Sequence, residues 1–150
     1  MSLDTTVALS PTERDDLRRI AGIMVPASAE FGVPGADNSS IFADIVKSLG
    51  RDLAAVRRAL ADLSTLAGGV FATLDDNRAE AVAEKFLAQE TPSLTALGRC
   101  VVQCYYRDDR VMLSLGIEPR PPFPQGHMIE QGDWSLLDPV RARAQMWRVA

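Results

Sequence analysis

The sequence predicts an all-α protein: a compact bundle of about five helices, an extended proline-rich C-terminal tail and a short terminal helix. Apolar residues recur every three or four positions between residues 10 and 116, and strict strand-like alternation does not persist anywhere. Four prolines between residues 119 and 124 then interrupt regular structure. We therefore expect a loose arm over residues 1–9, a helical bundle over 10–116 and a partner-docking tail over 117–150.

The first helix is predicted to begin at a capping box. Ser10 precedes Pro11, and Glu13 follows three residues after the serine, a pattern typical of a helix start. The apolar stripe contains Leu17, Ile20, Ala21 and Met24, and Pro26 ends the helix. The loop that follows, residues 26–38, lacks a phosphate-binding glycine pattern. We expect this loop to pack Phe31 against the bundle.

Three further helices are each predicted from a polar cap, an apolar stripe and a stop signal. The expected caps are Ser39 or Ser40, then Asp52, then Asp75 or Asp76. The stripes are Ile41, Phe42, Ile45 and Leu49; Leu53, Val56, Leu60 and Leu63; and Ala79, Val82, Phe86 and Leu87. Gly50 is expected to close the first of these helices and Gly68-Gly69 the second.

The fifth helix is predicted to begin with Thr91 as cap and Pro92 at its first position, and to end near Tyr106. Its buried face is expected to hold Leu94, Leu97, Val101, Cys104 and Tyr105. A short helix should follow, capped by Asp108 or Asp109 and ended by Gly116. Val111, Met112 and Leu115 are expected to form its buried side.

The prolines after residue 118 fix the backbone and remove hydrogen-bond donors, so this segment is expected to run extended with Phe123. Asp138-Pro139 then predicts a short helix with Val140, Ala144 and Trp147 on one side. Such a tail has no core of its own. We expect it to dock on another surface.

Composition excludes several classes of function. The net charge of −4 provides no basic surface for nucleic acid, and no apolar run approaches the length of a membrane span. No secretory or twin-arginine signal precedes Ser10, so the chain is expected to be cytoplasmic. Cys100 and Cys104 are interpreted as small buried apolar residues, because two cysteines supply only half of a structural zinc site.

Catalytic chemistry has few candidates. The single histidine, His127, lies in the tail, where Asp133 or Glu130 could serve as its carboxylate partner in a small helical enzyme. The pairs Asp15-Asp16, Asp75-Asp76 and Asp108-Asp109 all fall near predicted helix starts, where carboxylates complement the helix dipole. The last pair is also adjacent to Tyr106, Arg107 and Arg110, which could form a polar contact surface.

Several segments together resemble one known family. These are Ile-Met-Val-Pro-Ala at 23–27, Ile-Phe-Ala-Asp-Ile-Val at 41–46, Tyr-Tyr-Arg-Asp-Asp-Arg-Val-Met-Leu-Ser-Leu-Gly at 105–116 and Pro-Pro-Phe-Pro-Gln-Gly at 121–126. They resemble the gluconate 2-dehydrogenase subunit 3 family. The resemblance implies a small helical subunit of an FAD-dependent dehydrogenase of the glucose–methanol–choline (GMC) type, which oxidises alcohol groups of sugars. Many members of that family carry a twin-arginine export signal.

The leading hypothesis is therefore a non-catalytic subunit that binds and stabilises a large flavoprotein. The resemblance implies that FAD and the catalytic residues belong to that partner, so no catalytic, cofactor or metal site is assigned to this chain. The expected partner-binding residues are Tyr105, Tyr106, Arg110, Pro122, Phe123, Pro124, His127, Trp134 and Trp147. The alternatives are a stand-alone helical adaptor or regulatory module that binds a short peptide, and the small enzyme built on His127.

Overall fold

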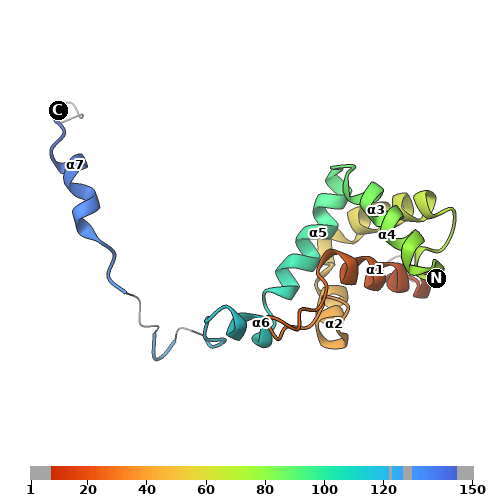
Figure 1. The fold of residues 1–150 in the computed structure, drawn as a ribbon, viewed down its shortest axis with the longest axis horizontal. Helices are drawn as coiled ribbons and strands as arrows, with labels where there is room; N and C mark the ends of the chain where they lie inside the picture. Colours follow the sequence, from red (N-terminus) through yellow and green to blue (C-terminus); the bar gives the residue numbers. More distant parts are fainter. Residues whose placement is uncertain (1–7, 122, 127–129, 145–150) are drawn as a thin grey trace, which may run out of the picture. The chain divides into compact units, whose positions relative to one another are not determined.

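The computed structural model describes residues 8–121, 123–126 and 130–144. Within these ranges the regular elements are all helical, which confirms the all-α prediction (Figure 1). The α-helices are α1 (Pro11–Met24), α2 (Ser39–Ser48), α3 (Leu53–Ala67), α4 (Asp76–Leu87), α5 (Pro92–Tyr105), α6 (Asp109–Ser114) and α7 (Asp138–Arg141). The 3₁₀-helices are η1 (Gly50–Asp52), η2 (Phe71–Thr73) and η3 (Trp134–Leu137). The chain divides into two units, one ending at Pro119 and the other beginning at Arg120.

The first unit is built around α5, which packs against both α2 and α3. Helix α3 in turn contacts α1 and α4, so the helices share one core. The predicted buried face of α5 is confirmed, because its five residues are all buried. Figure 1 shows α5 leading into α6 at one end of the bundle.

Most of the predicted helix starts are confirmed. Ser10 Oγ accepts the Glu13 N–H at 3.2 Å, and Glu13 Oε2 accepts the Ser10 N–H at 2.7 Å, which completes the capping box. Asp75, Thr91 and Asp108 cap α4, α5 and α6 with their side chains.

Two predicted caps are wrong. Helix α2 is capped by Asn38 rather than by Ser39 or Ser40, because the Asn38 Oδ1 atom accepts the Ser40 N–H at 3.3 Å. Asp52 precedes α3 as predicted, but its carboxylate pairs with Arg99 at 2.6 Å and makes no capping bond.

Glycine explains some of the predicted stops. Gly68 adopts the left-handed conformation at the end of α3 with φ 70°, and Gly116 does so after α6 with φ 73°. Gly50 does not end α2, because that helix stops at Ser48 and Gly50 begins η1.

Three side-chain and backbone predictions are also wrong. Phe31 is 67% exposed rather than packed on the bundle, and Leu115 is 56% exposed because it follows the six-residue α6, in which only Val111 is buried. Residues 123–125 form a turn with a cis Phe123–Pro124 peptide, so the proline segment is not continuously extended.

Asp16 is a buried charged residue that holds two parts of the bundle together. The interpretation of Asp16 as a helix-dipole residue is wrong, because its side chain points into the structure and accepts the Ala72 N–H at 2.7 Å. One turn later, Arg19 donates to the Ala72 carbonyl at 2.8 Å and pairs with Asp76 at 3.0 Å. Helix α1 therefore fixes both η2 and the start of α4.

Burial raises the pKa of the Asp16 carboxyl above 3.8, although the backbone N–H groups of Ala72 and Phe71 act in the opposite direction. A raised pKa means that the folded state favours the protonated form. The contribution of Asp16 to stability is therefore fully present below pH 3.8 and is lost as the pH rises through the folded-state pKa.

Asp16→Asn removes this titration but keeps a side-chain oxygen for the Ala72 N–H. We expect the stability of the variant relative to the wild type to increase as the pH rises from 4 to 7. Asp16→Ala should cost about 1–3 kcal/mol, because it leaves a part-buried N–H without its acceptor. Urea unfolding across this pH range measures both effects, and a constant difference between the Asn variant and the wild type would contradict the expected titration.

Candidate partner-binding site

A polar groove of about 400 Å³ lies where the end of α5 and the start of α6 meet α2. It is lined by Ser40, Ile41, Asp44, Cys104, Arg107, Asp108, Asp109 and Arg110. The lining residues come from segments more than sixty residues apart in the sequence, as the Asp44–Arg107 separation of 63 shows. The groove includes residues 107–110 of the 106–110 segment that the sequence indicates as a polar contact surface, but not Tyr106.

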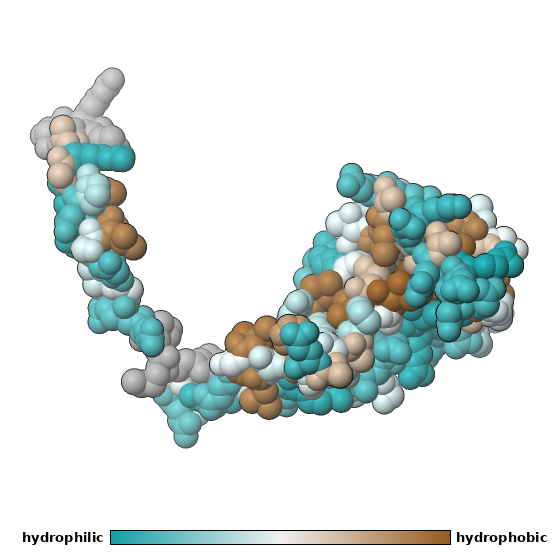
Figure 2. Space-filling model, in the orientation of Figure 1, coloured by the Kyte–Doolittle hydropathy of each residue, from teal (hydrophilic) through white to brown (hydrophobic). Residues whose placement is uncertain are grey.

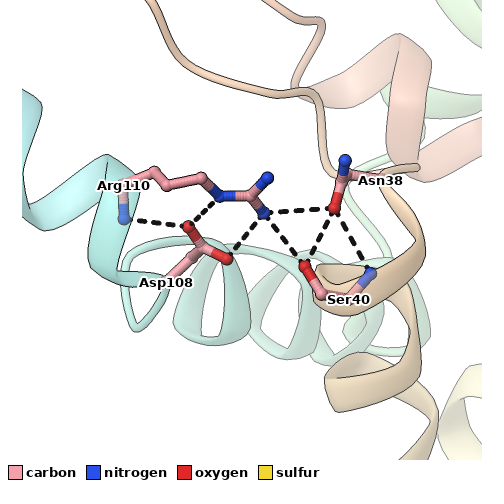
Figure 3. Close-up of polar contacts among 4 residues, drawn as sticks. All are labelled: Asn38, Ser40, Asp108 and Arg110. Carbon is pink, nitrogen blue, oxygen red and sulfur yellow. Dashed lines mark hydrogen bonds and ion pairs between the residues drawn. The ribbon is translucent and has the colours of Figure 1, made fainter.

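Arg110 joins α6 to the start of α2 (Figure 3). Its guanidinium binds both carboxylate oxygens of Asp108 at 2.9 Å, and its Nη2 also donates to Asn38 Oδ1 at 3.1 Å and Ser40 Oγ at 3.0 Å. Asp108 accepts the backbone N–H of Arg110 as well. We call Asn38, Ser40, Asp108 and Arg110 the α2–α6 clamp.

Arg107, which lies just beyond the last residue of α5, makes a second connection to α2. Its guanidinium donates to Asp44 Oδ2 at 2.6 and 3.1 Å, to Ser48 Oγ at 2.8 Å and to Cys104 Sγ at 3.3 Å. Both arginines of the groove are therefore already paired with carboxylates. The arrangement is suited to holding α6 in a fixed position on α2.

The pKa shifts of these charged groups agree with a role in holding α6 on α2. The side-chain bond from Arg110 lowers the pKa of Asp108, and Asp108 in turn raises the pKa of Arg110. The bond to Asp44 likewise raises the pKa of Arg107. Asp108 and Arg110 thus each favour the charged form of the other at neutral pH.

Exposed apolar side chains lie in α6 and in the residues directly before and after it. Tyr106 is 54% exposed, Leu113 61% and Ile117 50%, and together with Leu115 they form what we call the α6 surface. Figure 2 shows hydrophobic residues gathered at this end of the bundle. Tyr105 is buried in the core instead, where its ring supports Tyr106 in an edge-on contact with 5.3 Å between ring centroids. Tyr105 therefore does not present a free surface, in contrast to its assignment as a partner-binding residue.

The second unit contains the other described aromatic residues predicted to bind a partner. Phe123 is 85% exposed and Trp134 58%, and Leu136, Leu137 and Val140 are exposed as well. Pro124 is exposed in the turn at 123–125. Pro122, His127 and Trp147 lie outside the described residues.

The enzyme alternative depends on His127, which the structure does not describe. Of its two proposed carboxylate partners, Asp133 caps η3 by accepting the N–H and the hydroxyl of Ser135 at 3.0 and 2.6 Å. These bonds lower the pKa of Asp133, the hydroxyl contributing most. The other proposed partner, Glu130, is exposed.

Sequence reasoning missed three residues of the groove and the clamp. The sequence indicates Asn38 only as the end of a loop and Ser40 only as a possible helix cap, and it assigns no role to Asp44. A local signal existed for Asn38, because asparagine is as good a helix cap as serine. No local pattern could have paired Asp44 with Arg107, since that contact arises from the packing of α5 on α2.

The described part of the chain contains no group of three or more His, Cys, Asp or Glu side chains that could hold a metal ion. Among the same residues, no helix has the length and apolar character needed to cross a membrane. Comparisons with protein-family models, curated proteins and solved structures gave no match.

The clamp predicts an acid-sensitive contribution to stability. Because the pKa of Asp108 is depressed below 3.8, its ionised form contributes above that pH, and the contribution is lost as the pH falls through the folded-state pKa. Asp108→Asn keeps a capping oxygen but loses the charge. We expect the stability advantage of the wild type over this variant to shrink between pH 5 and pH 2, as measured by urea unfolding.

Asp16→Asn is the matched comparison for that experiment, because the pKa of Asp16 is shifted in the opposite direction. Its difference from the wild type should change mainly above pH 3.8 rather than below it. If Asp108→Asn and the wild type lose the same stability on acidification, the charge on Asp108 has no role in the clamp.

The two cysteines are predicted to be unreactive in the folded protein. Burial raises the pKa of both the Cys100 and the Cys104 thiols, which disfavours the reactive thiolate. A disulfide reagent such as DTNB should therefore label them slowly in buffer and rapidly in denaturing urea. Fast stoichiometric labelling of the native protein would contradict this expectation.

Proposed function

We propose that this chain is a non-catalytic accessory subunit that binds and stabilises a larger FAD-dependent dehydrogenase of the GMC type. The observation that carries the proposal is the exposure of every described residue between 121 and 144. The first unit buries most of its large apolar residues in one core. The described part of this segment has no such core and requires a surface to cover it.

The free energy available from burying the exposed apolar side chains of this segment supports a protein partner. Fully burying an exposed phenylalanine, leucine or valine side chain is worth about 1.5–3 kcal/mol. The five large side chains of this segment are 40–85% exposed, so their burial on a partner would contribute on the order of 5–9 kcal/mol. Helix α7 and η3 have four residues each, far below the length at which an isolated helix is stable in water. Packing against a partner would stabilise both.

The α6 surface supplies a second set of contacts in this proposal. Tyr106 is an aromatic residue of the kind that anchors protein interfaces, and the leucines beside it extend the apolar area. The α2–α6 clamp and Arg107 hold this surface on the bundle before binding. A surface that is already ordered loses less entropy on association.

The identity of the partner rests on the sequence block 105–116 and on 121–126, which resemble the gluconate 2-dehydrogenase subunit 3 family. In the first block, Asp108 and Arg110 form the clamp, Val111 enters the core and Gly116 ends α6 with positive φ. Residues of this block therefore hold α6, and with it the α6 surface, in position on the bundle. The flavin and the catalytic groups belong to the large subunit.

The experiment that tests this proposal is co-expression with the large FAD-dependent subunit. The full chain should co-purify with that subunit and increase its yield and activity. A chain ending at Pro119 should keep the helical circular dichroism of the bundle, because the first unit has its own core, but should lose co-purification. Co-purification of the shortened chain at full yield would show that the second unit is not needed for docking.

Trp134→Ala should weaken assembly by roughly 2 kcal/mol or more, because a large aromatic side chain at an interface is commonly an anchor. Arg141→Gln is the matched control, since Arg141 lies in the same segment and pairs only with exposed Asp138 among the described contacts. Titration of the purified partner with each variant measures the difference. Equal affinities of the two variants for the partner would show that Trp134 is not an anchor of the interface.

A further inference from the structure

We infer that the loop between α1 and α2 is a further contact with the same partner protein, with Phe31 inserted into an apolar pocket of that protein. The inference rests on the proposed function and adds to it a site in the first unit. Phe31 is 67% exposed and has no aromatic or cation–π contact among the described residues. Its ring is therefore not explained by packing within the bundle.

The backbone of this loop is already ordered without a partner. Ser28 and Val33 exchange two backbone hydrogen bonds of 3.0 Å, which closes a narrow turn around Phe31. The Phe31 N–H donates to Ser28 Oγ at 3.3 Å. At the base of the loop, the Ala36 N–H donates to the Val25 carbonyl at 2.9 Å.

Close packing at the base also restricts the sequence. A Cβ atom on Gly35 would lie 2.5 Å from Asp37 Oδ1 and 3.0 Å from the Ala27 nitrogen, so only glycine fits without a shift. Ala36, next to it, is fully buried. The loop thus has a fixed base and presents an aromatic ring at its tip, an arrangement that reduces the entropic cost of binding.

The loop is joined to the α6 surface through the clamp. Asn38, where the loop meets α2, accepts a hydrogen bond from Arg110 of α6 (Figure 3). Figure 1 likewise shows the chain between α1 and α2 passing next to α6. A protein that covers the α6 surface would therefore extend over the loop, which makes the two contacts parts of one interface.

Charge indicates the chemistry of the partner's side of this contact. Glu30 and Asp109 are both exposed, and neither has an ion-pair partner within the described residues. The two arginines that line the same groove as Asp109, Arg107 and Arg110, are already paired with Asp44 and Asp108. The matching surface should therefore combine an apolar pocket for Phe31 with basic side chains opposite Glu30 and Asp109.

The test uses the full chain and the large FAD-dependent subunit in a quantitative binding assay. Phe31→Ala should keep the wild-type melting temperature and raise the dissociation constant about tenfold or more. Leu66→Ala is the control, because Leu66 is a partly exposed apolar residue on α3 and should bind within about twofold of wild type. Glu30→Gln should weaken binding at low salt and have a smaller effect at high salt.

The outcomes separate this inference from the proposed function. A wild-type chain that binds while Phe31→Ala binds equally well overturns the inference alone. Equal weakening by Phe31→Ala and Leu66→Ala, or a lower melting temperature for Phe31→Ala, also overturns it, because the effect would then be structural. A wild-type chain that forms no complex overturns the proposed function together with this inference.

Discussion

The burial of α5 between α2 and α3 is the constraint on which the rest of the first unit depends. Leu97 and Val101 are inaccessible to solvent, and Ser93 and Cys100 on neighbouring faces are buried too, so α5 is covered over a wide arc. Its partner α3 also supports α1 and α4, which places most of the apolar residues in one cluster. The direction of α5 then decides where α6 begins.

The polar contacts fix this arrangement rather than supply most of its stability. Asp52–Arg99, Asp44–Arg107 and Asp108–Arg110 are three carboxylate–guanidinium pairs at the ends or edges of α5 and α6. Partly exposed pairs of this kind contribute little to the free energy of folding, but their planar geometry admits few orientations. The Asp44–Arg107 pair and the Asp108–Arg110 pair, whose arginines also contact α2 or its cap, therefore restrict how α6 lies on α2.

The distribution of apolar residues relates the fold to the proposed function. In the bundle, Phe71 and Phe86 are almost completely buried, whereas Phe31 and Tyr106 are exposed on a framework that is already ordered. In the second unit, Phe123 and Trp134 are exposed on a segment with little structure of its own. A partner would thus meet two kinds of surface: a rigid one, which favours specificity, and a short segment that gains order on binding.

The sequence by itself determined the helical class, most helix boundaries and the buried face of α5, because caps, prolines and apolar spacing act within a few residues. It also indicated that the residues around Arg110 could form a polar contact surface. Only the tertiary structure decided that Asp16 is buried, that Asp44 meets Arg107 and that Phe31 is exposed. Asp16 binds a backbone group 56 residues away, and Asp44 and Arg107 are 63 apart. Such contacts follow from how helices pack, and local patterns carry no information about distances across the fold.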